Sequence, residues 1–456
     1  MSASQALLAT AAKYFSRPAV ALLLFTACQR SGRTDDIARF DLTRINHVVV
    51  IYLENRSFDN LYGEFPGADG LNAARRSAPQ VDASGTPYAV LPQATESPFP
   101  PNLPNAPFDI GRFVPPSEAT RDLVHRFYQE QAQIDGGRMD RFVQVSDAMG
   151  LAMGYYRTGE LPLAALAREF TLCDRFFHSA FGGSFLNHQW MVAARTPEYH
   201  GAPEAMRAII DAAGTLRRDG AITPDGFVVN TAYSTQGPHP IVPATELMHP
   251  FTSPTIGDRL SDKGITWAWF AGGWADAEAG RPMRDFQYHH QPFVYFARYA
   301  EGSAGRREHL KDETEFVAAA RAGTLPAVSF VKPSGFENEH PGYTDVIRGE
   351  RHVLELIDDV RNGPNWNDTI IIVTYDENGG LWDHVAPPAG DRWGPGSRVP
   401  TIVISPFARR HYVDHTIYET MSILALIERR WGLAPLSARD RAANPLEGAF
   451  DGALAR

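Results

Sequence analysis

The sequence of 456 residues is long enough to bury a substantial core, and its length fits two or three domains or one large α/β domain. Apolar residues make up 44% and charged residues 21%, which excludes a disordered or fibrous chain. The net charge of −10, without a basic stripe, excludes a nucleic-acid-binding protein.

The first 27 residues have the composition of a secretory signal. Lys13 and Arg17 precede an apolar run at 19–25, and small residues stand before Cys28. The run is too short to span a bilayer, which needs about 20 apolar residues. The segment LFTAC resembles a bacterial lipobox, which would make Cys28 the lipidated first residue of the mature chain. We therefore expect export from a bacterial cell, either to the periplasm or to a membrane through the lipid anchor; simple secretion and a leader without an anchor are the alternatives.

The rest of the chain divides into a linker, one large domain and a tail. We assign residues 28–44 to a flexible linker, 45–435 to the domain and 436–456 to a C-terminal tail. The chain has two cysteines, Cys28 and Cys173, so a disulfide framework and a thiolate zinc site are both excluded.

Strand and helix patterns alternate along the domain. Nearly continuous apolar runs, typical of strands buried on both faces, occur at 45–53, 266–270, 327–331, 369–375 and 399–404. Helical patterns occur at 312–322, 350–361 and 416–430, from 117 to 143, and at 164–177 before that segment becomes extended. This alternation predicts an α/β fold with a largely parallel central sheet flanked by helices.

Two insertions interrupt the alternation. Residues 64–116 contain eleven prolines, which predicts an ordered, loop-rich excursion. Residues 217–243 alternate and turn as hairpins do, which predicts a small β-rich insertion. We expect both insertions to shape the mouth of a binding pocket.

Two acidic segments stand directly after predicted strands. Glu54 and Asn55 follow the first strand, and Asp376 and Glu377 follow the strand at 369–375. Ligands of open α/β sheets bind beyond the carboxyl ends of the strands. Acidic pairs at that edge repel each other unless a cation lies between them, and carboxylate and amide oxygens suit Mg²⁺, Ca²⁺ or Mn²⁺. We interpret the two segments as one divalent-metal site; the alternative is that each caps a helix.

Ser184 follows two glycines and stands at the start of a predicted helix, in the segment FGGSFLNHQW. Backbone N–H groups at a helix N-terminus stabilise anions, including phosphate oxygens and an alkoxide. Taken alone, this serine is an ordinary helix cap. It becomes a nucleophile if a metal or a base lowers the pKa of its hydroxyl group.

Histidines form the third group of candidate residues. His289 and His290 are adjacent, and His340 lies in a loop that contains proline and aromatic residues. Such side chains can donate to phosphoryl oxygens and protonate a leaving alkoxide. His125 stands alone in the segment LVHRF, where an ordinary core or surface histidine is the simpler interpretation.

These candidates lie in segments that resemble the phosphoesterase family, which unites bacterial acid phosphatases and non-specific phospholipases C. The resemblance rests on HVVVIYLENRSFDNLYG, AFGGSFLNHQW, YHHQPFVYF, NEHPGYTD, VTYDENGGLWDHVAPP and WGPGSRVPTIVISPFA, which follow the family order between about Ile45 and Trp431. It implies an alkaline-phosphatase-like fold, with residues 45–435 as the catalytic domain.

The resemblance also implies roles for single residues. One divalent metal ion would be held by Glu54, Asn55, Asp376 and Glu377. Ser184 would be the nucleophile and a further ligand of that ion. Four histidines would grip the phosphoryl group or serve as the acid: His125, His289, His290 and His340.

The implied substrate is a phosphate ester. The phospholipase branch typically carries threonine in a TDPNR-like motif where this chain has GGSFLNH, which favours a broad-specificity acid phosphatase that acts through a phosphoserine intermediate. A phospholipase C that cleaves phospholipid head groups is the alternative. A third hypothesis, a surface protein that keeps the fold as a non-catalytic binding platform, would require that the nucleophile or the metal ligands be missing.

Overall fold

The structure is a computed structural model that describes residues 40–451. The expected signal segment 1–27, the lipidation residue Cys28 and the linker up to residue 39 lie outside the described residues. Between residues 40 and 451, no helix combines the length and the apolar character needed to cross a membrane.

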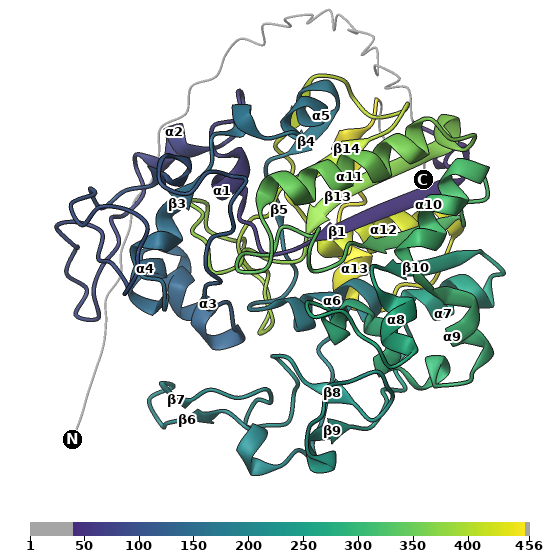
Figure 1. Ribbon diagram of the computed structural model, residues 1–456, viewed down its shortest axis with the longest axis horizontal. Helices are drawn as coiled ribbons and strands as arrows, with labels where there is room; N and C mark the ends of the chain where they lie inside the picture. The colour runs from purple at the N-terminus through teal and green to yellow at the C-terminus, as the bar shows by residue number, and fades with distance from the viewer. Residues whose placement is uncertain (1–39, 452–456) are drawn as a thin grey trace, which may run out of the picture. The chain divides into compact units, whose positions relative to one another are not determined.

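An eight-stranded sheet forms the centre of the domain (Figure 1). The strand order is β11-β10-β12-β1-β13-β14-β4-β15, and only β14 runs antiparallel to its neighbours. The sheet is therefore largely parallel, as predicted. Its strands are β1 (His47–Leu53), β4 (Thr171–Cys173), β10 (Trp267–Ala271), β11 (Leu310–Asp312), β12 (Val328–Lys332), β13 (Thr369–Tyr375), β14 (Thr401–Ile404) and β15 (Tyr412–Asp414).

The pairing of β1 with β13 sets the position of the acidic segments. Both strands are apolar runs, and every residue except His47 is buried, as expected for strands covered on both faces. Their parallel register runs to Leu53 opposite Tyr375. The residues that follow these two positions therefore leave the sheet side by side at its carboxyl edge, where ligands of such sheets bind.

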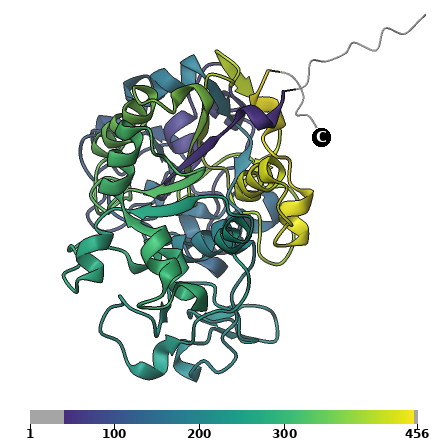
Figure 2. The ribbon, with the colours of Figure 1, turned by 90° about the vertical axis from the view of Figure 1, so that its right-hand side faces the viewer.

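Helices cover both faces of the sheet. The pair α10 (Glu313–Ala322) and α11 (Val346–Arg361) lies on one face, and α12 (Thr420–Trp431) lies on the other with α6 (Ser184–Ala193) packed against it (Figure 2). The other α-helices are α1 (Phe58–Tyr62), α2 (Leu71–Ala74), α3 (Phe127–Ile134), α4 (Phe142–Val145), α5 (Ala164–Glu169), α7 (Ile256–Asp262), α8 (Trp274–Glu278), α9 (Ala304–His309) and α13 (Ala438–Ala442).

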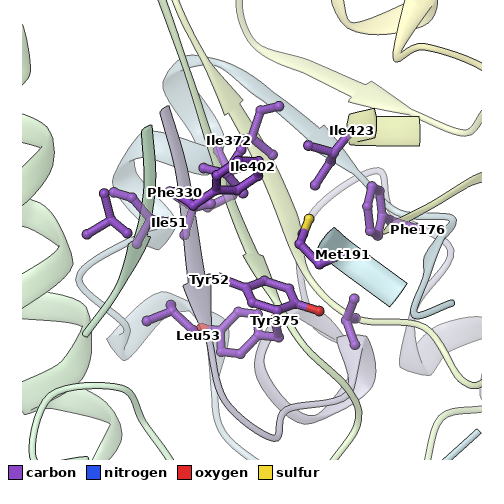
Figure 3. Packing of buried hydrophobic residues seen from close by; sticks show 14 of the residues in the cluster. Ile51, Tyr52, Leu53, Phe176, Met191, Phe330, Ile372, Tyr375, Ile402 and Ile423 are labelled. Atoms are coloured by element: carbon purple, nitrogen blue, oxygen red, sulfur yellow. The ribbon is translucent and has the colours of Figure 1, made fainter. Parts of the chain in front are cut away.

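Strands and helices share one buried core. Figure 3 shows side chains of neighbouring strands packed together, with side chains of α6 and α12 beside them. The residues labelled there are Ile51, Tyr52, Leu53, Phe176, Met191, Phe330, Ile372, Tyr375, Ile402 and Ile423.

The five predicted strands agree with the structure to within two residues at each end. The helix predicted from 350 begins earlier, at Val346, because Asp345 caps it by accepting a hydrogen bond from Arg348 N at 2.9 Å.

The helical pattern from 117 to 143 was only partly right, since residues 117–126 contain no helix and α3 begins at Phe127. The backbone of this segment pairs with a distant loop instead, where Gly342 N donates to Thr120 O at 2.7 Å.

The insertions are irregular, with small strands. Residues 64–116 contain α2, the 3₁₀ helix η2 (Ile110–Arg112) and β2 (Phe108–Asp109), which pairs with β3 (Gly154–Tyr155), and otherwise consist of turns and irregular segments. The β-rich insertion extends beyond 217–243, and it contains a single hairpin. Its strands are β6 (Ile209–Ile210) with β7 (Leu216–Arg218), which are antiparallel, and β8 (Tyr233–Ser234) with β9 (Leu247–Met248), which are parallel.

Both ends of the described chain pack on the domain. Within the segment expected as a tail, α13 packs against α12. The Phe450 ring stacks on Phe40, from the segment expected as a linker, at a centroid distance of 5.1 Å. A further pair of short strands, β5 (Phe176–Phe177) and β16 (Tyr418–Glu419), precedes α12.

Candidate active site

The two acidic segments meet at the carboxyl edge of the sheet. Glu54, Asn55, Asp376 and Glu377 are all fully buried. The Asp376 Oδ1 atom accepts hydrogen bonds from the backbone N–H groups of Asn55 at 3.0 Å and Glu377 at 2.8 Å. The loop that follows fits closely around them: a Cβ atom at Gly379 would lie 2.4 Å from the carbonyl oxygen of Asn55, so only glycine fits. Neither acidic pair is an isolated helix cap; together they form one cluster, as predicted.

Ser184 belongs to the same cluster. Its hydroxyl group lies 2.9 Å from Glu54 Oε2 and 3.2 Å from Asn55 Oδ1, and its side chain is 7% exposed. Ser184 is the first residue of α6, and Gly183 is the N-cap. The serine therefore does not serve as the helix cap, and its hydroxyl group faces the carboxylates.

Two of the predicted histidines lie against Asn55. The Nε2 atoms of His340 and His125 lie 3.0 and 3.2 Å from the amide nitrogen of Asn55. Their Nδ1 atoms contact the backbone carbonyl oxygens of Pro341 and Leu123, respectively, which can only accept hydrogen bonds. With the proton on Nδ1, each neutral ring presents Nε2 as an acceptor to the amide NH₂ group.

The other two predicted histidines lie on the side of Glu54. His290 Nε2 lies 3.1 Å from Glu54 Oε1, and the ring of His289 packs edge-on against that of His290, with 4.8 Å between centroids. Both residues belong to the short 3₁₀ helix η8 (Tyr288–His290). The structure thus brings all nine predicted site residues into one cluster.

Sequence reasoning missed two residues of this cluster, Lys332 and His188. The Lys332 ammonium group is fully buried and contacts Glu54 Oε1, and it also lies 3.3 Å from the carbonyl oxygen of Leu53. Lys332 is the last residue of β12, so a charged residue at the carboxyl end of a predicted buried strand was the available signal. His188 lies one helical turn after Ser184, and its ring stacks on His290 at 5.4 Å.

Burial and neighbouring charges shift the pKa values of the acids in opposite directions. Burial raises the pKa of Glu54, but Lys332 and His290 outweigh it and hold this pKa well below its ordinary value. Burial together with the Glu54 carboxylate raises the pKa of Asp376 well above its ordinary value. Burial and Asp376 do the same for Glu377. Three carboxyl groups thus share one lysine, and they cannot all ionise at low cost without a further cation.

Burial also lowers the pKa values of His289, His290 and His340. The pKa of His340 is lowered to about 3, and the pKa of His289 lies well below its ordinary value. These rings are therefore neutral in the free protein near neutral pH, and a bound anion would favour their protonated forms.

A cavity of about 150 Å³ opens beside Ser184. Its lining includes Glu54, His125, Ser184, His289 and His340, together with Asp122, Arg126, Asn230, Thr231, Gln287 and Tyr343. Asn230 and Thr231 belong to the 217–243 insertion, as expected. No described residue of 64–116 lines this cavity; that excursion lines a separate cavity of about 650 Å³, with Trp382 and Tyr155.

The donor set around Ser184 fits a hard divalent cation. With the Asn55 NH₂ group on the two histidines, its oxygen lies 2.7 Å from Glu377 Oε1, 3.1 Å from Glu54 Oε2 and 3.2 Å from the Ser184 hydroxyl group. Asp376 Oδ2 is buried without a hydrogen-bond partner. Oxygen acceptors that converge with fewer donors than acceptors are stabilised by a metal ion.

Two sets of carboxylate and histidine side chains lie beside the oxygen atoms around Ser184. One set is Glu54 with His188 and His290, and the other is Asp122 with His125 and His340. Within each set, the possible ligand atoms lie within 4.8 Å of one another. Nitrogen ligands are therefore near on both sides of the oxygen donors.

Similar proteins were found by sequence and by structure. Phospholipase C A of Mycobacterium tuberculosis (strain CDC 1551 / Oshkosh) is 27% identical over 429 residues, which cover 86% of this chain and 74% of that protein. The non-hemolytic phospholipase C of Pseudomonas aeruginosa is 24% identical, over 91% of this chain and 56% of that protein. Non-specific phospholipase C1 of Arabidopsis thaliana is 24% identical, over 89% of this chain and 71% of that protein.

Among solved structures, a protein of the alkaline phosphatase superfamily from Vibrio parahaemolyticus aligns over 73% of this chain and 76% of its own, with 12% identity and a TM-score of 0.34, which is too low to carry a conclusion. The Phosphoesterase family matches residues 45–434, which include every residue of the cluster around Ser184. The chain belongs to the phosphoesterase family and is a hydrolase that acts on phosphoester bonds.

Proposed function

We propose that the protein is a metal-dependent phosphoester hydrolase in which Ser184 is the nucleophile. The observation that carries this proposal is the position of the Ser184 hydroxyl group, which lies among Glu54 and Asn55 and lines the cavity beside them. A serine in an ordinary cap position would instead bond the backbone of its own helix. The non-catalytic hypothesis is disfavoured because none of the five residues to which we assign these roles, Glu54, Asn55, Ser184, Asp376 and Glu377, is missing.

The proposed metal ligands are Glu54, Asn55, Asp376, Glu377 and Ser184. Their oxygen atoms favour Mg²⁺, Ca²⁺ or Mn²⁺. Such an ion, when bound, lowers the pKa of the serine hydroxyl group and offsets negative charge on the phosphoryl oxygens. Within the protein, Glu54 Oε2 at 2.9 Å is an acceptor for the proton that Ser184 loses.

The reaction would proceed in two steps. Ser184 Oγ forms a bond to phosphorus while the bond to the ester oxygen breaks. The leaving alkoxide takes a proton from His340, whose ring is neutral in the free site and gains that proton when the anionic substrate binds. Water then attacks the phosphoserine, which releases phosphate and restores the hydroxyl group. His125, His289 and His290 would hold the phosphoryl oxygens, and a bound anion favours the protonated forms of His289 and His290, whose pKa values are lowered by burial in the free site.

We propose a broad range of phosphomonoesters as the substrate. The cavity of about 150 Å³ supports this, because it is smaller than the usual ligand pocket of about 300–1,000 Å³ and suits a phosphoryl group with the first atoms of its alcohol. A phospholipase C activity is the second candidate, and the names of the sequence relatives favour it. In that case the lipid would remain outside the cavity while its phosphodiester enters.

The nucleophile is tested by Ser184→Ala. We expect turnover of p-nitrophenyl phosphate to fall by at least about 10³-fold with the fold intact by circular dichroism. Acid quenching of the native enzyme with ³²P-labelled substrate should yield phosphoserine at position 184. Near-normal turnover by the variant would overturn the assignment.

The substrate class is tested with two substrates under the same conditions. Turnover of p-nitrophenyl phosphate is compared with release of phosphocholine from phosphatidylcholine micelles. Higher kcat/KM on the monoester supports the phosphatase, and higher kcat/KM on the micelles replaces it with the phospholipase C.

We also propose that the protein is exported and that Cys28 is its lipidated first residue. The composition of residues 1–27 and the LFTAC segment support this. Mass spectrometry of the mature protein from a bacterial host tests it. An intact N-terminus, or a mature chain without lipid on Cys28, would contradict the lipid anchor.

A further inference from the structure

A buried carboxylate outside the cavity contacts the turn that carries the nucleophile. Glu130 lies on α3 and is fully buried, as are His178 and Ser397, the residues around it. Its Oε2 atom accepts a hydrogen bond from the backbone N–H of Gly182 at 2.6 Å. Gly182 stands two residues before Ser184, so this bond connects α3 directly to the turn from which the nucleophile projects.

The second carboxylate oxygen of Glu130, Oε1, also has hydrogen-bond partners. Its Oε1 atom lies 2.9 Å from His178 Nε2, and it accepts from the backbone N–H of Ser397 at 3.0 Å and from the Ser397 hydroxyl group at 3.1 Å. Burial raises the pKa of Glu130, but His178 and these hydrogen bonds outweigh it and lower that pKa below its ordinary value. A buried carboxylate that accepts from two backbone N–H groups and a hydroxyl group, and also lies against a histidine ring nitrogen, has one well-defined position.

The turn held by Glu130 is closely packed against the segment before α3. Gly182 has φ +84°, and a Cβ atom there would lie 2.3 Å from the backbone nitrogen of Phe127. A Cβ atom at Gly183 would lie 2.8 Å from the carbonyl oxygen of His125. The turn and the backbone of His125 therefore touch, and any shift of Gly182 away from Glu130 would change the separation between Ser184 and His125.

The other hydrogen bonds of this turn do not use the backbone N–H of Gly182, which donates to Glu130. The Asn187 side chain bonds the backbone N–H of Ala180 at 2.9 Å and the carbonyl oxygens of Ala180 and Gly182 at 2.9 and 3.1 Å. These contacts fix the turn relative to its own helix, α6. The bond from Gly182 to Glu130 is the contact that fixes it relative to α3, the helix that follows His125.

We propose that Glu130 is a positioning residue for the reaction: by holding Gly182 it sets the place of Ser184 Oγ relative to His125 and the phosphoryl group. This inference rests on the proposed function of Ser184. Glu130 does not line the cavity, and it is linked to Ser184 through the backbone of the turn. Its charge also contributes to the raised pKa of Glu377, so the Glu130→Asp variant, which keeps the charge, isolates the effect of position. Misplacement of a nucleophile by about 1 Å is enough to cost a large part of the rate.

The test compares Glu130→Gln with a matched control, Glu313→Gln. Glu313 is also a buried glutamate paired with a histidine, with 2.7 Å between its Oε1 atom and His352 Nε2, and it lies outside the cavity lining. We expect both variants to lose thermal stability. Glu130→Gln should lower kcat on p-nitrophenyl phosphate by about 10- to 100-fold with KM within about twofold, because the groups that bind the substrate remain. Glu313→Gln should keep kcat within about twofold.

A second measurement distinguishes a misplaced Ser184 from general damage to the active site. Orthovanadate mimics the five-coordinate phosphorus and needs an in-line oxygen of Ser184, whereas inorganic phosphate does not. The inhibition constant of vanadate should rise in Glu130→Gln by a factor similar to the fall in kcat, with the constant of phosphate within about twofold. Glu130→Asp is measured as well, and alone if Glu130→Gln fails to fold; it retains the charge and withdraws both oxygens by one methylene, and the same loss of kcat is expected.

Two outcomes would overturn the inference. One is a kcat of the folded Glu130 variant within twofold of the wild type or of the Glu313 control. The other is an equal loss for vanadate and phosphate. Ser184→Ala is assayed alongside: if it keeps its turnover, the proposed function itself fails, whereas loss in Ser184→Ala with normal turnover in the Glu130 variants removes only the positioning role.

Discussion

Two buried charge clusters arise from the same two loops, and they differ in how completely their charges are matched. The segment after β1 contributes Glu54 to one cluster and, from the start of α1, Asp59 to the other, and the loop after β13 contributes Asp376 and Asp383. We name them the site cluster (Glu54, Asp376, Glu377, Lys332) and the Arg398 cluster (Asp59, Asp383, His384, Arg398).

The Arg398 cluster is saturated. The guanidinium group of Arg398 donates to Asp383 Oδ1 at 2.8 Å and Asp59 Oδ1 at 3.2 Å, and to the carbonyl oxygens of Asp69 and Asp174 at 2.7 Å each. His384 Nδ1 lies 2.6 Å from Asp59 Oδ2. Two acids meet two bases here, and no carboxylate oxygen of this cluster lacks a partner.

The site cluster has the opposite character. Three acids share Lys332, and Asp376 Oδ2 has no hydrogen-bond partner. Burial raises carboxyl pKa values in both clusters, at Asp376 and Glu377 here and at Asp383 beside Arg398, so the unpartnered oxygen is what distinguishes the site cluster. A saturated buried cluster fixes the loops that bear it, whereas unmatched buried charge marks the place where a ligand acts. The difference between the clusters thus separates the part of each loop that holds the structure from the part that does the chemistry.

The largest expected effect comes from Asp376→Asn. We expect kcat on p-nitrophenyl phosphate to fall by at least about 10³-fold, because a proposed metal ligand next to the nucleophile is lost. Stability in EDTA should not decrease, because the substitution removes a charge that repels Glu54. Turnover of the wild type and the variant is measured without EDTA, and their urea midpoints are measured in EDTA. A variant that is clearly less stable in EDTA would mean that the site cluster is balanced by protein groups alone.

The next effect is on stability, from Arg398→Met. Removal of one partner from a buried ion cluster leaves uncompensated charge and should cost about 3–5 kcal/mol of unfolding free energy. Urea denaturation measures the loss. Arg321→Met is the control, because Arg321 forms an exposed pair with Asp359 and its removal should leave the urea midpoint unchanged. Equal midpoints for the two variants would contradict the structural role of the Arg398 cluster.

A smaller effect is expected for Lys332→Met. Glu54 then loses its nearest cation and depends on the divalent ion, so the rise in Tm on addition of Mn²⁺ should be larger than in the wild type. Turnover with Mn²⁺ should fall by about tenfold, because Glu54 is held less well. Differential scanning calorimetry with and without the ion checks the first point. An unchanged or smaller rise in Tm would show that Lys332 does not share Glu54 with the ion.

The smallest effect is a pH dependence in the Arg398 cluster. Burial lowers the pKa of His384, but Asp59 outweighs it and raises this pKa above its ordinary value of 6.5. A raised pKa in the folded state adds stability below pH 6.5, and this stability is lost as the pH rises through the folded value. We expect His384→Gln to cost about 1 kcal/mol at pH 6 and less at pH 9, measured by urea denaturation. A loss of unfolding free energy in His384→Gln that grows with pH would contradict a raised pKa of His384 in the folded protein.

The metal-ligand candidates could be located from the sequence because they depend on local features. Glu54 and Asp376 each follow an apolar run, and parallel strands deliver the residues after them to one edge. The strands themselves were predicted within two residues for the same reason, since a run of β-branched residues buried on both faces is recognisable without knowledge of its neighbours. The roles of Ser184 and His125 came from family resemblance, since each alone had an ordinary structural interpretation. His289, His290 and His340 were already candidates from their own segments, and the resemblance gave them specific roles.

Only the tertiary structure decided which groups meet. Lys332 ends one strand and reaches Glu54 on the next, and Glu130 reaches Gly182 from a separate helix; neither contact leaves a signal in the spacing of residues. The helical pattern at 117–126 misled because that segment bonds a distant loop instead of itself. The sequence by itself determined which residues follow each strand at the edge of the sheet, because the local hydrophobic pattern locates the strands. Packing between distant segments decided which charges remain unmatched, because burial and pairing are properties of the assembled fold.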